Sequence, residues 1–175
     1  MTITAGTWFP VITLLLGFAT KSVADWFQDS RIAKREALIR RENRRDEARI
    51  RQLEFQRSNL LELQESAARF IKTLGSAHYH DVKTCRESGT WSRSLLPDDL
   101  NENLYQNQTR TKLLAERVAD EAARLLGRGL LAAGVTVTMA QSEAESDQAV
   151  MEAGQKIDAL NQRIGELLRA IDETE

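Results

Sequence analysis

The only two histidines of the chain lie in its one cluster of metal-binding residue types. His78, His80 and Asp81 fall within four residues, and Cys85 follows closely. A zinc ion needs three or four such ligands that converge on one point. On a helix, side chains two positions apart point about 200° away from each other, so His78 and His80 would converge only in a loop. We therefore expect no metal site, no catalytic site and no enzyme activity.

Two glycines later in the chain have the spacing of a phosphate-binding loop. Gly129 and Gly134 are separated by four residues, but Val135 and Thr136 occupy the positions where such a loop carries Lys and Ser or Thr. Lys and the hydroxyl must reach phosphate and magnesium, so the pattern is incomplete. We expect no cofactor and see no site for a small-molecule substrate.

Basic residues are concentrated between Arg31 and Arg51, where nine of them outnumber four acidic residues. Such a segment can set membrane topology, contact anionic lipid or contact nucleic acid. Its closeness to an apolar segment favours the first two functions. Nucleic-acid binding is disfavoured because no aromatic residues are interleaved. The residues to which we assign topology or anionic-lipid contact are Arg31, Lys34, Arg35, Arg40, Arg41, Arg44 and Arg45.

The apolar segment is the N-terminus, which has no charged side chain before Lys21. Trp8 and Trp26 are 18 residues apart, about 27 Å along a helix, close to the roughly 30 Å thickness of the hydrocarbon layer. Aromatic residues at both ends suit the membrane interfaces. We predict one transmembrane helix with the bilayer as a partner. Its anchor residues are Trp8, Phe9, Leu14, Leu15, Leu16, Phe18, Trp26 and Phe27.

The flanking charges predict the orientation of this segment. No basic residue precedes it and many follow, which predicts a single-pass protein of the plasma (inner) membrane with its N-terminus outside and its bulk in the cytoplasm. Two alternatives stay open. Ser22-Val23-Ala24 resembles a signal-peptide cleavage site, although the basic region of a signal peptide is missing. The apolar run is also short enough for a helix that lies in the interface or packs on a partner.

The rest of the chain predicts an all-α fold, since only two prolines and nine glycines interrupt its 175 residues. A single cysteine excludes an intramolecular disulfide. We predict a small antiparallel bundle with helices at about 53–85, 98–132 and 142–172. The predicted domains are the anchor 1–27, an Arg-rich helical stalk 28–52, and a cytoplasmic bundle 53–175 with a connector at 76–97.

The last predicted helix carries the clearest periodic pattern. Its apolar residues alternate steps of three and four positions, the spacing that keeps one seam against a partner helix. The seam can pack inside the bundle or join two copies of the chain. Its residues are Val150, Ala153, Ile157, Leu160, Ile164, Leu167 and Ile171.

These features predict an interaction protein: a membrane-anchored scaffold, adaptor or assembly subunit that presents its bundle to a protein partner or to further copies of itself. The alternative is a membrane effector or regulator, such as a bacterial or phage-encoded exclusion or defence factor, that acts through oligomerisation of the span.

Overall fold

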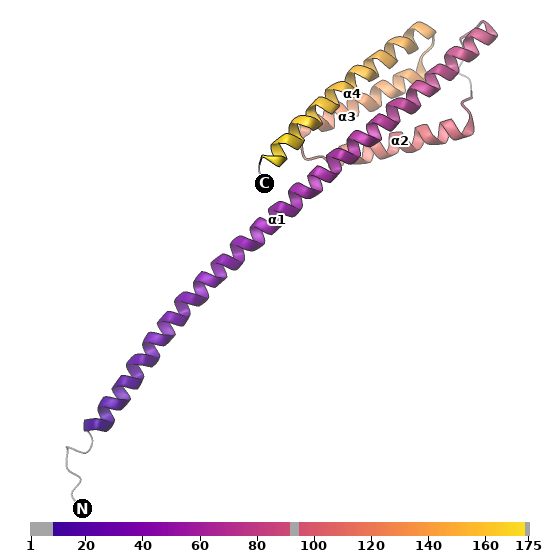
Figure 1. The fold of residues 1–175 in the computed structure, drawn as a ribbon. Coiled ribbons are helices and arrows are strands. Elements are labelled where there is room, and N and C mark those ends of the chain that lie inside the picture. Colours follow the sequence, from indigo (N-terminus) through magenta and orange to yellow (C-terminus); the bar gives the residue numbers. More distant parts are fainter. Residues whose placement is uncertain (1–8, 92–94, 174–175) are drawn as a thin grey trace, which may run out of the picture. The chain divides into compact units, whose positions relative to one another are not determined.

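The computed structural model describes residues 9–91 and 95–173, with side chains from Lys34 onward. Within these ranges the chain forms four helices and no strand, which confirms the all-α prediction (Figure 1). The chain divides into two compact units, Met1–Ile50 and Arg51–Glu175, and each is described by itself. The helices are α1 (Phe9–Ser88), α2 (Asp98–Arg117), α3 (Glu121–Met139) and α4 (Glu143–Asp172).

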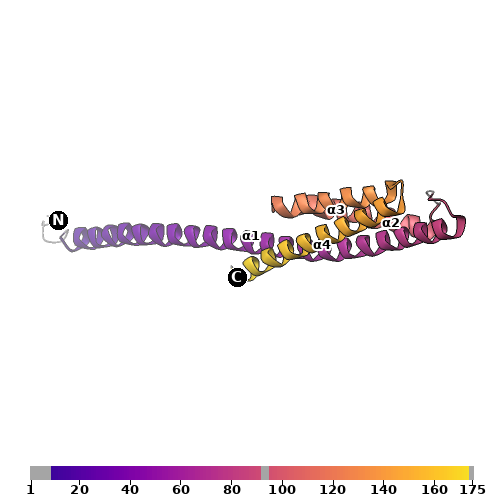
Figure 2. The same cartoon turned by 90° about the horizontal axis from the view of Figure 1, so that it is seen from above.

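The second unit is a bundle in which successive helices run in opposite directions (Figures 1 and 2). α3 packs against both α2 and α4. Ser66 of α1 and Thr111 of α2 share a buried hydrogen bond of 2.9 Å between their hydroxyls. Arg57 of α1 donates a hydrogen bond of 2.5 Å to Asp172 of α4. The C-terminal part of α1 therefore contacts both α2 and α4, and the four helices close into a ring.

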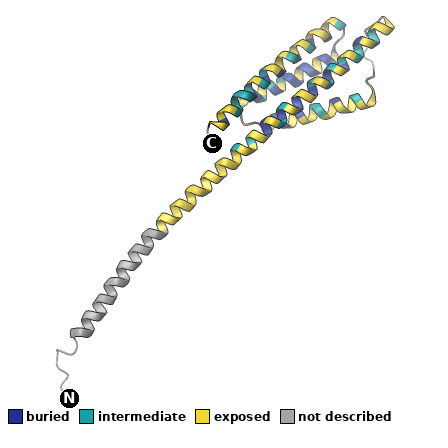
Figure 3. Cartoon of the chain, in the orientation of Figure 1, coloured by how far each residue is buried: buried dark blue, intermediate teal, exposed yellow. Residues whose placement is uncertain are grey.

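The core lies on the faces that the four helices turn toward one another (Figure 3). Burial of each large apolar side chain contributes about 1.5–3 kcal/mol. The predicted seam of α4 belongs to this core, because five of its residues are buried and Val150 and Leu167 pack partly buried against them. The seam therefore packs against other helices of the same chain. The largest fully buried apolar side chains are Phe70, Leu63, Leu74, Leu130, Leu160, Ile164 and Val118.

α1 continues through most of the predicted connector and ends only at Ser88. Gly75 does not break it, because Leu74 and Ala77 on either side remain buried against the bundle. The helix ends where Gly89 adopts a φ of 73°, a left-handed conformation that glycine tolerates best. The N–H of Gly89 donates to the carbonyl of Cys85 at 2.8 Å.

The predicted helix 98–132 is instead two helices, with a break at residues 118–120. Asp120 begins α3, and its side chain accepts a hydrogen bond from the N–H of Ala123 at 2.8 Å. Ser142 begins α4 in the same way, at 3.2 Å from the N–H of Glu145. Side-chain oxygens at these positions satisfy backbone donors that a helix start leaves unpaired. The glycines near residue 130 lie inside α3 and do not end it.

The N-terminal segment requires a correction. Among the residues that the structure describes, no helix is both long enough and apolar enough to cross a bilayer. The prediction of a single-pass plasma-membrane protein is therefore wrong. The reason is length: α1 begins at Phe9, so only about 18 Å of helix precede the first charge at Lys21, against roughly 30 Å of hydrocarbon.

One of the predicted anchor residues, Trp8, lies outside the described residues. The other predicted anchor side chains belong to the part of α1 in which only the backbone is described, as does Arg31. They are Phe9, Leu14, Leu15, Leu16, Phe18, Trp26 and Phe27.

Candidate functional site

The cluster predicted around His78 is divided between two environments. His78 extends from α1 to α4, where its Nδ1 lies 2.8 Å from Oγ of Ser146 and its Nε2 lies 3.1 Å from Oδ1 of Asp147. Nδ1 of His80 lies 4.0 Å from Oδ1 of Asp81 on the same helix. In the described part of the chain, no three His, Cys, Asp or Glu side chains come close enough to hold a metal ion.

Ser146, His78 and Asp147 have the residue types of a hydrolytic triad, but the imidazole meets serine through Nδ1 and aspartate through Nε2, and the exposures of the two partners are also reversed. A catalytic serine must reach substrate while its aspartate is buried. Here Ser146 is fully buried, whereas 57% of the Asp147 side chain is exposed. Substrate could not reach the hydroxyl in this arrangement. The three side chains are therefore suited to fastening α1 to α4, since the imidazole satisfies a buried hydroxyl.

A cavity of about 340 Å³ lies beside His78 at the same end of the bundle. Its polar wall comes from α1 and α2, and its apolar wall from the segment before α2 and from the end of α3. Nearby, the indole N–H of Trp91 donates to the carbonyl of Ala140 at 3.1 Å and so holds the α1–α2 connection against the end of α3. The lining residues are Ala77, His78, Asp81, Leu95, Leu96, Asp98, Asn101, Val137 and Thr138.

An ion pair joins the start of α3 to α4. Arg163 of α4 donates to both carboxylate oxygens of Asp120, at 3.1 Å to Oδ1 and 2.7 Å to Oδ2. This guanidinium holds the pKa of Asp120 below its usual range, and the N–H of Ala123 acts in the same direction. The Asp120 carboxylate raises the pKa of Arg163 in turn. One carboxylate thus caps α3 and joins it to α4.

Replacing Asp120 with asparagine is expected to reduce stability at neutral pH and to have little effect in strong acid. Asparagine can still cap the helix but carries no charge for Arg163. Because folding lowers the pKa of Asp120, its stabilisation is present above the unfolded-state pKa of about 3.9 and is lost as the pH falls through the lower folded-state value. Urea unfolding of both proteins between about pH 7 and pH 2 measures this difference.

The matched control for this prediction is Glu121→Gln, which removes a neighbouring carboxylate whose side chain is mostly exposed. It is expected to change stability little at any pH. A destabilisation by Asp120→Asn that persists unchanged at low pH would contradict the electrostatic explanation.

An apolar groove of about 650 Å³ runs between α2 and α3. One wall carries Tyr105, which is 66% exposed, and the other carries Val135, which is 45% exposed. Leu131 forms part of the buried floor, and the exposed Met139 lies one helical turn beyond Val135. The full lining is Tyr105, Gln108, Thr109, Lys112, Glu116, Arg128, Leu131, Ala132 and Val135.

A charged pair closes one end of this groove. Arg128 donates from Nε and Nη2 to the two carboxylate oxygens of Glu116, each at 2.8 Å. The guanidinium lowers the pKa of Glu116, so the carboxylate stays ionised. Lys112 adds a positive charge to the α2 wall. This groove has no signal in the sequence, because exposed apolar residues such as Tyr105 and Val135 indicate a surface only once the two helices are known to be neighbours.

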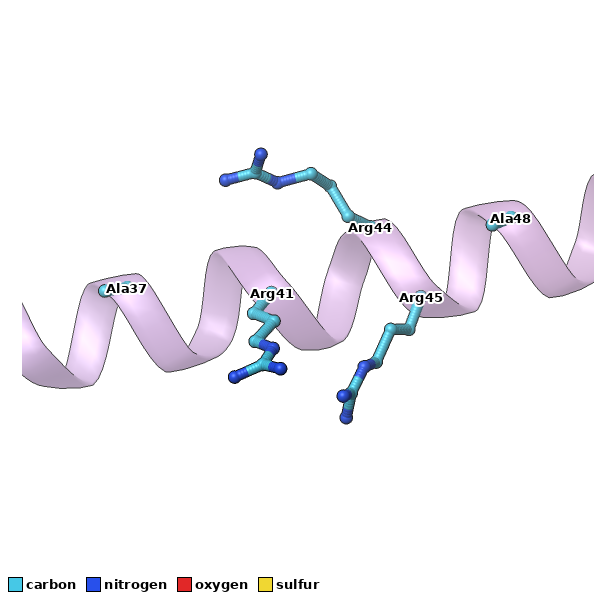
Figure 4. Close-up of a pocket in the computed structure, with 5 residues that line it drawn as sticks. All are labelled: Ala37, Arg41, Arg44, Arg45 and Ala48. Atoms are coloured by element: carbon cyan, nitrogen blue, oxygen red, sulfur yellow. The ribbon is translucent and has the colours of Figure 1, made fainter.

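The predicted lipid-contact residues Lys34, Arg35, Arg40, Arg41, Arg44 and Arg45 are all exposed on α1. Arg40 pairs with Glu36 at 3.6 Å, and Nε of Arg44 donates to the carbonyl of Arg40 at 3.2 Å. A shallow hollow between the side chains of Arg41, Arg44 and Arg45 has Ala37 and Ala48 at its two ends (Figure 4). All of its lining comes from one helix, so the hollow has no opposite wall and is an open surface.

No family model, no characterised protein and no solved structure matches this chain.

Proposed function

We propose that the protein is an interaction subunit whose helical bundle binds a protein partner through the groove between α2 and α3. The observation that supports this proposal is the exposure of large apolar side chains on both walls of one groove, with Tyr105 on α2 and Val135 on α3. When a partner covers apolar side chains in a groove, these side chains are removed from water, and this burial favours binding.

The chemistry of the groove suggests what kind of partner it binds. The α3 wall has Leu131, Ala132 and Val135 at helical spacing, and Tyr105 is the one large apolar lining residue of the α2 wall. An apolar stripe of this kind suits an amphipathic helix that inserts side chains three and four positions apart. The pair of Glu116 and Arg128 already neutralises itself at one end. Lys112 is then the charge that a partner carboxylate would meet. We therefore propose a helix with an apolar stripe bordered by an acidic residue.

The test is a comparison of groove variants in the cells that produce the protein. Replacing Val135 with glutamate places a charge in the groove without touching the buried core, because Val135 is exposed. The wild-type chain is expected to be purified with one stoichiometric partner, seen as a defined mass of the intact particle. The Val135→Glu chain is expected to lose that partner and to keep its own helical circular dichroism.

A matched control distinguishes the groove from a general effect of charge. Met151 of α4 is likewise exposed but lies outside the groove, so Met151→Glu makes the same type of change elsewhere. It is expected to retain the partner. Loss of the partner with both variants, or a particle that contains no second protein, would contradict the proposal. A homo-oligomer that survives Val135→Glu would also contradict it.

The alternative function as a membrane effector is not proposed, because it depends on a span and no helix among the described residues can cross a bilayer.

A further inference from the structure

In the basic segment of the first unit, most basic side chains lie on one side of the helix and the acidic side chains lie on others. At about 100° per residue, Lys34, Arg41, Arg44, Arg45 and Arg49 fall within about 140° of the helix circumference. We call these five residues the basic face. All of them are exposed. Over Lys34 to Arg49 the face is about 22 Å long at 1.5 Å per residue.

The acidic residues of the segment lie off this face. At the same angular spacing, Glu42 falls just outside its edge, and Glu36, Asp46 and Glu47 lie further round the helix. The ion pair between Arg40 and Glu36 is accordingly formed away from the basic face. Within the described residues, no carboxylate pairs with Arg41, Arg44 or Arg45. In Figure 4 these three side chains extend away from the helix, Arg44 to one side of the view and Arg41 and Arg45 to the other, and their charge is available to a partner.

The remainder of the surface indicates which polyanion fits. A helix that lies on a lipid surface needs an apolar side opposite its charges. Here the opposite side carries Asp46 and Glu47, with only Ile39 and Ile50 as large apolar residues. A protein interface needs an apolar core, but on the basic face Leu38 is the only large apolar residue. Nucleic acid requires neither feature, because release of counterions from phosphates supplies the affinity.

The form of nucleic acid follows from the shape of the element. Single strands are bound by aromatic side chains that stack on bases, and residues 34–50 contain no aromatic residue. The major groove of double-stranded RNA is too narrow and deep for side chains to read. The major groove of B-form DNA is about 12 Å wide and admits a helix of about 10–12 Å diameter. Arginine, which makes up four of the five basic residues, binds phosphate through two parallel hydrogen bonds.

We propose that the basic face of residues 34–49 binds the phosphate backbone of double-stranded DNA without sequence preference. Between residues 34 and 49 the face carries no Asn, Gln, Ser or Thr, and its one lysine and four arginines are residue types that contact phosphates. The DNA site lies on a different surface from the groove of the proposed function and does not depend on it.

The test measures binding of the full chain to a fluorescent 30-base-pair duplex by anisotropy at several salt concentrations. With five phosphate contacts, the logarithm of the binding constant is expected to fall with a slope of about −4.5 against the logarithm of salt concentration. The double variant Arg41→Gln/Arg45→Gln is expected to weaken binding by at least about tenfold at low salt and to reduce the slope by about 2. Duplexes of unrelated sequence are expected to behave alike.

The control variant Arg35→Gln/Arg40→Gln removes the same charge from other sides of the same helix. It is expected to bind the duplex nearly as tightly as the wild-type chain. Equal losses for the two double variants would overturn the proposal, because net charge alone would then explain binding. Binding to vesicles that contain phosphatidylserine but not to DNA would overturn it in favour of lipid. Equal affinity for polyglutamate would overturn it in favour of an acidic protein.

Discussion

Replacing Phe70 with alanine is expected to lower the free energy of unfolding by about 3–5 kcal/mol. Phe70 lies on α1, is 1% exposed, and is the largest fully buried side chain of the bundle. Its removal loses the burial of the ring and leaves a cavity that the four helices can close only in part. For a bundle of this size the loss is a large share of total stability. Urea unfolding followed by circular dichroism measures it.

The same substitution at Phe55 provides the control for this prediction. Phe55 lies on α1 about two helical turns before Leu63, but the residue is 56% exposed. Phe55→Ala is expected to change the free energy of unfolding by less than about 0.5 kcal/mol. Comparable losses at both positions would show that the core is not centred on the residues described.

Replacing Gly134 with alanine is expected to destabilise the bundle by about 1–3 kcal/mol, although alanine favours helix more than glycine does. A Cβ at this position would lie 2.5 Å from Cζ of Phe70 and 3.0 Å from Cε1. The ring cannot easily move, because it is enclosed on all sides. Glycine at this position of α3 is therefore required by the close approach of α1. Thermal unfolding of the two proteins measures the effect.

Gly154 of α4 offers the opposite case. Beyond the adjoining residues and local backbone of α4, no atom lies within 4 Å of a Cβ built there, so Gly154→Ala is expected to stabilise the protein by about 0.5–1 kcal/mol. Combining Gly134→Ala with Phe70→Leu is expected to recover part of the loss at Gly134, since the smaller side chain makes room. A stabilising Gly134→Ala would contradict the described contact.

The sequence predicts the fold well where a periodic pattern is long. The α4 seam is visible from spacing alone, because helical packing selects steps of three and four residues. Helix ends are harder to predict. Gly75 resembles a terminator but lies within α1, whereas the break before α3 depends on Asp120 as a capping residue. One capping oxygen is a weak signal among many exposed aspartates.

The candidate surfaces also differ in how far the sequence alone predicts them. Arginine spacing along a single helix allows the basic face to be drawn from the sequence, because only the helical period is needed. The groove can be predicted only when Tyr105 and Val135 are known to lie on neighbouring helices. The contacts of His78 with Ser146 and Asp147 join residues nearly 70 positions apart, and no local pattern encodes them. Pairing between distant helices is decided by the whole core.

The closed ring of helices also determines when the protein can fold during its synthesis. Of the four described helices α1 is made first, but Arg57 and His78 find their partners Asp172 and Ser146 only on α4, which is made after the other three. At about 5–20 residues per second, the 30 residues of α4 take roughly 1.5–6 s to translate. During that interval Leu63 and Phe70 have no α4 to cover them. The nascent chain is thus expected to present a chaperone-binding surface until α4 has been made.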